Sequence, residues 1–187
     1  PYYIILILMA LKANAQYMHY SVKDGDTINI VDKDSLRQGV WRTYYSTGKF
    51  KAEVVYKNNK KQGIEIQWHN NLSNCVKQEA FYNNGVLDGP ITYYAKNCKK
   101  ELIETYKNGV KEGYEISYHN NGQIKAEGNY KKGNLDGVYK IYDKSGKFSF
   151  ESRSTNEEVT YEPNMEDTAN YGVYKVLARN TKWKKTM

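Results

Sequence analysis

Long apolar stretches, cysteine and histidine are all scarce in this sequence of 187 residues. Mean hydropathy is −0.83 and the one long apolar run covers residues 2–11, which excludes a protein that crosses a membrane several times. The 2 Cys and 3 His supply too few clustered ligands for a metal site. Since a Gly-x-Ser-x-Gly elbow, a phosphate-binding loop and a dinucleotide fingerprint are also missing, we expect no catalytic residues, no metal, no cofactor and no enzymatic activity.

Tyrosine and glycine are abundant, with 19 Tyr and 14 Gly against 3 Pro. Tyrosine favours strands and glycine favours turns, so the composition predicts an all-β protein with many short strands. The net charge is +7 and the pI is about 9.1, with basic and acidic residues interspersed. Such an excess can serve nucleic acid, anionic lipid or an acidic partner, but we interpret it first as a contribution to solubility.

Residues 1–15 have the features of a secretory signal peptide that is N-terminally incomplete, since Met and a basic segment are missing. The apolar run is too short for a spanning helix, and Ala13-Asn14-Ala15 forms a small-x-small cleavage site. We therefore expect cleavage after Ala15 and a secreted or periplasmic protein. No cysteine follows the cleavage site, so no lipid anchor is expected. The alternative reading is a buried N-terminal strand.

A repeat of about 24 residues dominates the rest of the chain. Five marker glycines stand 24, 26, 24 and 24 residues apart, at Gly39, Gly63, Gly89, Gly113 and Gly137. An aromatic residue follows each of them five positions later, at Tyr44, Trp68, Tyr94, Tyr118 and Tyr142. Three positions after a second tyrosine, four copies carry Asn59, Gly85, Gly109 or Gly133. We assign both sets of glycines to turns, because glycine tolerates the left-handed backbone that tight turns need.

Each repeat contains two segments of strand length, and the second alternates charged with apolar residues. Lys51 with Glu53, and Lys125 with Glu127, occupy alternate positions, which predicts the second tyrosines on one face and a Lys/Glu row on the other. The connections are too short for the crossovers of parallel strands. The predicted fold class is all-β, an elongated single-layer antiparallel β-meander built from about five tandem 24-residue β-hairpin repeats. We expect a signal peptide at residues 1–15, an N-terminal capping segment at 16–37, the repeat domain at 38–154, and a linker with a C-terminal cap or tail at 155–187.

The repeat reads Gly-x-x-x-x-Tyr-x-x-x-Gly-x-x-x-x-Glu-x-x-Tyr-x-x-Gly, and residues 113–136 follow this pattern best. It resembles the MORN-repeat family in its bacterial variant form, including the YwqK-type antitoxin-like repeat proteins. The resemblance covers about residues 38–151. It implies a single-layer meander that serves as a binding or scaffolding surface, and in some members one that contacts phospholipid or membrane.

Cys75 and Cys98 stand where the hairpin-turn glycine of their repeats is missing. Both lie equally far from the centre of the linker between their strands, so antiparallel pairing sets them opposite each other. Opposed Cβ atoms can approach to about 4.5 Å, which is compatible with a bridge after small adjustment. Because export supplies an oxidising compartment, we predict a Cys75–Cys98 disulfide. Two unrelated free thiols are the alternative.

The histidines and glutamates form no catalytic constellation. His69 and His119 hold equivalent strand-end positions in repeats that are not adjacent, too far apart to share a metal, and His19 is solitary. The glutamates of the charged row alternate with lysines, as cross-strand ion pairing on a solvated face requires.

The candidate binding surface is the face that carries the first aromatic residues of the repeats, Tyr44, Trp68, Tyr94, Tyr118 and Tyr142, insofar as these rings do not pack on one another. The leading hypothesis is a secreted or periplasmic, non-enzymatic protein that binds an unknown protein or cell-envelope partner. The alternative, implied by the family resemblance alone, is an antitoxin or immunity-like protein that neutralises a toxin by direct binding. Export argues against nucleic acid, whereas membrane-surface contact and an edge-strand homodimer stay open.

Intact-mass measurement of fresh protein, with and without reductant, tests the predicted bridge between Cys75 and Cys98. Reduction should add the two hydrogen atoms of the restored thiols, and the bridge should stabilise the fold by about 3 kcal/mol. The same mass before and after reduction would refute the bridge.

Overall fold

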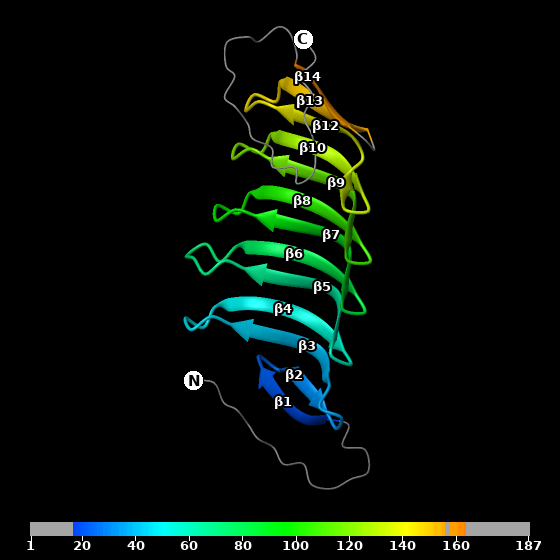
Figure 1. Ribbon diagram of the computed structural model, residues 1–187. Coiled ribbons are helices and arrows are strands. Elements are labelled where there is room, and N and C mark those ends of the chain that lie inside the picture. The colour runs from blue at the N-terminus through cyan, green and yellow to red at the C-terminus, as the bar shows by residue number, and fades with distance from the viewer. Residues whose placement is uncertain (1–16, 156–157, 164–187) are drawn as a thin grey trace. The chain divides into compact units, whose positions relative to one another are not determined.

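The computed structural model describes residues 17–155 and 158–163, which form strands joined by turns (Figure 1). The strands are β1 (Tyr17–Lys23), β2 (Asp26–Asp32), β3 (Arg37–Tyr44), β4 (Phe50–Lys57), β5 (Lys60–Trp68), β6 (Val76–Asn83), β7 (Val86–Tyr94), β8 (Lys100–Lys107), β9 (Val110–Tyr118), β10 (Ile124–Lys131), β11 (Asn134–Leu135), β12 (Gly137–Tyr142), β13 (Phe148–Thr155) and β14 (Glu158–Pro163). They neighbour one another in chain order, except that β10 is followed by β12 and the short β11 pairs with β10. The described residues contain no helix, and the predicted all-β antiparallel meander is confirmed.

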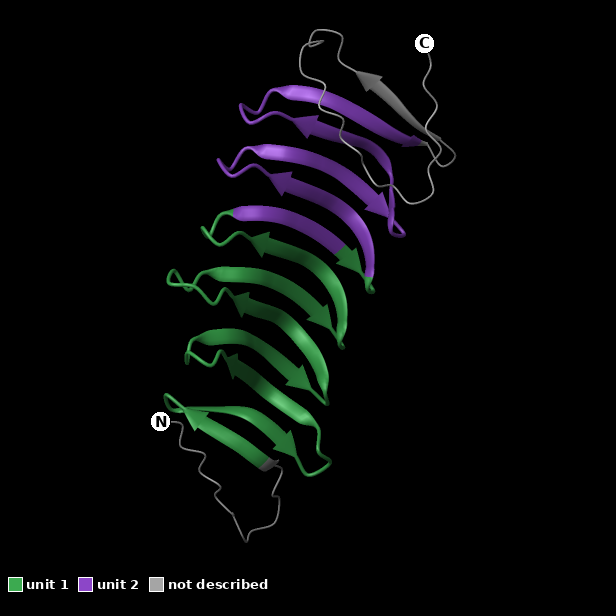
Figure 2. Cartoon of the chain, turned by 60° about the vertical axis from the view of Figure 1, so that its left-hand side comes forward, with its two compact units in different colours: residues 1–99, 106–109 green, residues 100–105, 110–187 purple. Residues whose placement is uncertain are grey.

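The chain divides into two compact units (Figure 2). Unit 1 comprises residues 1–99 and 106–109, and unit 2 comprises residues 100–105 and 110–187. Strands β1 to β7 thus belong to unit 1, β9 to β14 belong to unit 2, and β8 is divided between them. The predicted signal peptide and most of the predicted C-terminal tail lie outside the described residues.

Strands β1 and β2 form a hairpin that precedes the first repeat. They are joined at Asp24-Gly25, and β2 pairs with β3. Asn29 exchanges two hydrogen bonds with the backbone of Arg42 in β3, 2.8 and 3.1 Å long. Ile28 is only 2% exposed, so the hairpin also has an apolar anchor. Residues of the predicted capping segment therefore cover the edge of the first repeat.

Successive repeats are joined by two-residue linking turns in which both residues have positive φ. Between β6 and β7, Asn84 has a φ of 50° and Gly85 a φ of 84°, as a type I′ turn requires. The equivalent turns are Asn58-Asn59, Asn108-Gly109 and Lys132-Gly133. The twist of a hairpin favours this turn type over its mirror image, which accounts for the Asn and Gly residues. The structure thus places Gly85, Gly109 and Gly133 in turns.

The five marker glycines do not lie in turns, so the turn assignment is wrong for this set. They fall inside strands or at the start of one: Gly39 in β3, Gly63 in β5, Gly89 in β7, Gly113 in β9 and Gly137 in β12. Their φ angles run from 66° to 157°. The register also shifts here: Val55 faces Gln62 but Glu53 faces Ile66, so three residues of β5 stand against one of β4. Such a bulge bends the strand and uses the same positive φ as a turn, which explains the misassignment.

Each linking turn is hydrogen-bonded to the first strand of the hairpin that it follows. The amide of Gly85 donates to the carbonyl of Lys61 over 2.8 Å. The equivalent bonds join Asn59 to Arg37 (3.1 Å), Gly109 to Leu87 (2.7 Å) and Gly133 to Lys111 (2.9 Å). We call this series the turn ladder. It continues the pairing of the two strands of each hairpin up to the linking turn.

Substitution of Gly133 tests the backbone requirement of the linking turns. Its φ is 82°, and an added Cβ would meet Val110 Cγ1 at 3.9 Å, so backbone strain rather than crowding sets the cost. We expect Gly133→Ala to lower the free energy of unfolding in urea by about 1 kcal/mol. The matched variant Gly133→Asn should lose less, because Asn59 holds the equivalent position with a φ of 63°. Equal losses in the two variants would contradict this account.

Candidate functional site

The register sorts the side chains of each unit onto two faces, because residues directly opposite on antiparallel strands share a face. In unit 1 one cross-strand row consists of Arg42, Glu53, Ile66, Glu79 and Thr92. In unit 2 the corresponding row consists of Ile116, Glu127, Lys140 and Glu151. We call the face with these rows the glutamate face. The opposite face, which we call the core face, carries the buried Val54, Ala80, Ile91 and Ala126.

Two aromatic residues of the predicted binding surface donate hydrogen bonds to the glutamate face. The Tyr94 hydroxyl donates to Glu79 Oε2 over 2.9 Å, and the Tyr142 hydroxyl donates to Glu127 Oε1 over 2.6 Å. Burial, together with the bond to Glu79, raises the pKa of Tyr94 to about 12. The bond to Glu127, followed by burial, raises the pKa of Tyr142. Both hydroxyl groups are thus occupied within the protein.

The other aromatic residues of the predicted surface lie at the same strand ends. Tyr44 and Trp68 both pack on Phe50, with ring centroids 5.2 and 5.6 Å from it. Lys23 Nζ lies 3.6 Å from the centroid of the Tyr44 ring. Tyr118 ends β9 opposite Ile124. These rings thus contribute to the packing of their own sheet, and less of their surface is left for contact with a partner.

The lysines and glutamates of the charged row do not pair as expected. Glu53 instead binds Arg42 Nε at 2.5 Å, while Glu79 and Glu127 accept the tyrosine hydroxyl groups. In the part of the chain that the structure describes, no ion pair involves the row's lysines Lys51, Lys77 or Lys125. The tyrosine hydroxyl groups bind the carboxylates in place of the lysine ammonium groups. The side chains of these lysines extend into solvent instead.

The core face holds two clusters of lysine, glutamate and tyrosine. In unit 1, Lys61 Nζ binds Glu65 Oε2 at 2.7 Å and lies 4.6 Å from the centroid of the Tyr82 ring. The Glu65 side chain is 8% exposed. Burial lowers the pKa of Lys61, but the bond and charge of Glu65 outweigh it, so this pKa is raised overall. The pair is therefore charged and closed upon itself.

The cluster of unit 2 repeats this arrangement with one more carboxylate. Lys111 binds Glu115 and also Glu104, the latter at 2.7 Å, and lies 4.0 Å from the centroid of the Tyr130 ring. The Tyr139 hydroxyl donates to Glu115 over 3.0 Å. Burial lowers the pKa of Lys111, but the hydrogen bonds of the two carboxylates raise it above its usual range.

Sequence reasoning missed both clusters, although a signal was present. Lys stands two positions before the marker glycine and Glu two positions after it in the second and fourth repeats. In the third repeat the same positions carry Leu87 and Ile91. The fold therefore accepts either a charged or an apolar pair at this place.

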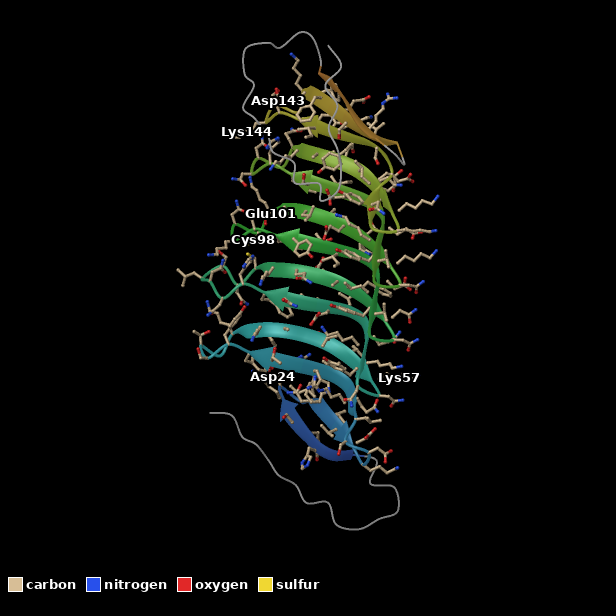
Figure 3. All side chains as sticks on the ribbon, viewed as in Figure 1. Asp24, Lys57, Cys98, Glu101, Asp143 and Lys144 are labelled. Carbon is tan, nitrogen blue, oxygen red and sulfur yellow. The ribbon has the colours of Figure 1, made fainter. Side chains whose placement is uncertain are left out.

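Cys75 and Cys98 lie together in unit 1, beside the turns at one edge of the sheet; Figure 3 labels Cys98 there. Both are free thiols, and hydrogen bonding to Cys75, followed by burial, raises the pKa of Cys98. Cys98 has a φ of 66° and donates its amide to Ala95, as Gly122 does to His119 in its own hairpin turn. Cys98 thus replaces the hairpin-turn glycine. The disulfide itself stays a prediction.

The two repeat histidines join consecutive hairpin turns. His69 Nε2 binds the carbonyl of Tyr94 at 2.8 Å, and His119 Nε2 binds the carbonyl of Tyr142 at 2.9 Å. A carbonyl oxygen accepts, so Nε2 carries the proton in both rings. Within residues 17–155 and 158–163, no three His, Cys, Asp or Glu side chains are placed to hold a metal ion. Over those ranges the chain also has no helix with the length and apolar character that a membrane span requires.

The architecture defines a protein of tandem antiparallel hairpins. Residues 37–58 and 111–132 match the family described as MORN repeat variant. Both segments contain a marker glycine, the strand that bends at it, and the strand that leads to the next linking turn. These two segments are thus similar to MORN repeats, the family that the spacing of the glycines and aromatic residues resembles. No curated protein matches the sequence.

A double-mutant test addresses the pair Lys61–Glu65. We expect Lys61→Leu to lower the free energy of unfolding by about 2 kcal/mol, because it leaves the buried Glu65 carboxylate without its cation. The double variant Lys61→Leu/Glu65→Ile should recover most of this loss. It places at positions 61 and 65 the two apolar residues that the third repeat has at the equivalent positions, Leu87 and Ile91. Urea denaturation measures both. A double variant no more stable than the single one would contradict the expectation.

Proposed function

We propose that this protein is a non-enzymatic binding or scaffold protein, which offers its sheet to a protein or cell-envelope partner. The observation that carries the proposal is the exposure of large apolar side chains within regular strands. Ile64 in β5 is 56% exposed and Tyr114 in β9 is 69% exposed. Both follow a marker glycine by one position, on the glutamate face. Apolar side chains gathered on one face are typical of interaction surfaces.

The titratable groups support a non-enzymatic role. Lys61 and Lys111 are each held by glutamates of the same cluster, and Glu79 and Glu127 accept hydrogen bonds from tyrosines. An acid/base catalyst needs a group that can reach a substrate and exchange a proton with it. Lysines and glutamates that already bind partners within the protein contribute to its stability instead.

Export to an oxidising compartment is the second part of the proposal. The apolar run and the small-x-small site in residues 1–15 motivate it. The contact between the thiols of Cys75 and Cys98 supports it, because a structural disulfide needs such an environment. The bridge would join the hairpin turns of the second and third repeats.

Neutralisation of a toxin by direct binding is the alternative proposal. It comes from the YwqK-type resemblance and would use the same exposed side chains. Co-expression with the product of a neighbouring toxin gene tests it: restored growth supports neutralisation, and unchanged toxicity contradicts it.

Site-specific photocrosslinking tests the binding proposal. A photoreactive amino acid at position 64 or 114, on the glutamate face, should give a discrete adduct in native cell-envelope extract. The control is the same amino acid at the exposed turn position of Ser145, which should give no such adduct. If neither position on the glutamate face crosslinks above this control in replicate extracts, the binding role is wrong.

A further inference from the structure

A strip of exposed apolar side chains crosses unit 1 on the glutamate face. We call Val55, Ile64, Phe81 and Val86 the apolar strip; they belong to the consecutive strands β4, β5, β6 and β7. Their exposed fractions are 40%, 56%, 39% and 44%. Ile64 lies directly opposite Phe81, and Val55 and Phe81 each follow a glutamate of the row by two positions. The strip therefore runs across the strands rather than along one of them.

The repeat does not require an apolar residue at the positions of Val55 and Phe81. Val55 and Phe81 precede the second tyrosine of their repeats, and in unit 2 the equivalent positions carry Thr105 and Asn129. Around Asn129, β9 and β10 pair with the same strand-end register shift as the hairpins of unit 1. Part of the Phe81 ring has a structural role, since it lies over Gly89 at 3.0–3.3 Å from an ideal Cβ there. Val55 has no comparable contact with Gly63, because an ideal Cβ at Gly63 would meet nothing from the facing strand within 4 Å.

Lysines border the strip at the edge with the linking turns. Lys57 follows Val55 by two positions and lies opposite Lys60, so both share the strip's face. Both are exposed, and among the described residues neither takes part in an ion pair. Figure 3 shows Lys57 at the edge of the sheet away from Cys98. On the other flank, Glu53 and Glu79 are already bound to Arg42 and Tyr94. Asp88, two positions after Val86, accepts hydrogen bonds from the side chain of Asn83 and the amide of Asn108. The carboxylates beside the strip thus have partners, whereas Lys57 and Lys60 take part in no ion pair among the described residues.

The direction of the strip favours a helix as its occupant. Neighbouring strands are about 4.8 Å apart, so four strands span about 14 Å. A helix advances about 5.4 Å per turn, so apolar residues at i, i+4, i+7 and i+11 nearly match the strand spacing over about three turns. An added strand would instead pair with an edge of the sheet and would not lie across its face.

We propose that the apolar strip binds an acidic amphipathic helix of a partner protein, with the helix lying across β4 to β7 and its carboxylates toward Lys57 and Lys60. This proposal rests on the proposed binding function and names the partner's chemistry. A second copy of the chain fits poorly, since it would set lysines against lysines. A flat anionic bilayer fits less well than a helix, because it would also meet the carboxylates of Glu53 and Glu79. A helix can keep its acids on one flank.

Selection from a displayed library of amphipathic helices tests the proposal on the full chain. The library fixes apolar residues at i, i+4, i+7 and i+11 and randomises the flanking positions. We expect enriched clones to be acidic beside the apolar stripe. Fluorescence anisotropy of an enriched peptide should show at least tenfold weaker binding to Val55→Thr/Ile64→Thr, and likewise to Lys57→Glu/Lys60→Glu.

Matched variants in unit 2 serve as controls. Val110→Thr removes an exposed apolar side chain at the position equivalent to Val86, and Lys131→Glu corresponds to Lys57→Glu; both should bind the peptide as the original chain does. Unchanged circular dichroism verifies that the strip variants fold. Enrichment of basic or neutral helices, no enrichment, or binding that survives the strip variants would overturn the proposal. So would strip-dependent binding to phosphatidylglycerol vesicles without helix enrichment. In each of these cases, adducts from the photocrosslinking experiment would leave the general binding role standing.

Discussion

The hydrogen bond from each linking turn to the first strand of the hairpin that it follows, such as that from Gly85 to Lys61, holds the open end of every hairpin in place. A lone hairpin is marginal in water, and ordinary pairing joins it only to its nearest strands. The turn ladder continues the pairing of each hairpin up to the edge of the sheet where the linking turns lie. The first strand of each hairpin bends near this edge, and the bulge at the marker glycine provides that bend. The regular spacing of the marker glycines thus matches the regular spacing of the ladder bonds.

The bends also explain why charge is buried in a sheet of this kind. At the bulge between β4 and β5, Lys61 and Glu65 lie on either side of Gly63 and close upon each other on the core face. The Tyr82 ring lies beside the ammonium group, with its centroid 4.6 Å from Lys61 Nζ. The third repeat fills the same place with Leu87 and Ile91. Neighbouring repeats thus differ in polarity at equivalent positions, and a slip of one repeat would set a buried charge against an apolar side chain.

Much of the fold could be predicted from the sequence, because Asn-Gly pairs and regularly spaced aromatic residues report local backbone geometry. The marker glycines were misassigned because a bulge and a turn both require positive φ, and a sequence does not tell which one uses it. Alternation did not indicate that the hydroxyl groups of Tyr94 and Tyr142 would occupy the carboxylates expected to pair with lysines. The register shifts at the strand end, as between Tyr44 and Phe50, and counting by two fails there. The apolar strip was missed because each of its residues looks ordinary until the register sets Ile64 beside Phe81.

The insertion in the second repeat shows where this architecture accepts change. The spacing from Gly63 to Gly89 is 26 residues instead of 24, and the extra residues enlarge the hairpin turn that contains Leu72, which is 98% exposed. The linking turns on either side keep their two-residue form and their ladder bonds. A hairpin turn can therefore take two more residues without a change in the linking turns beside it. Gene duplication in units of one hairpin would change the number of strands. The strand pairing and the turn contacts of the other repeats would keep their register.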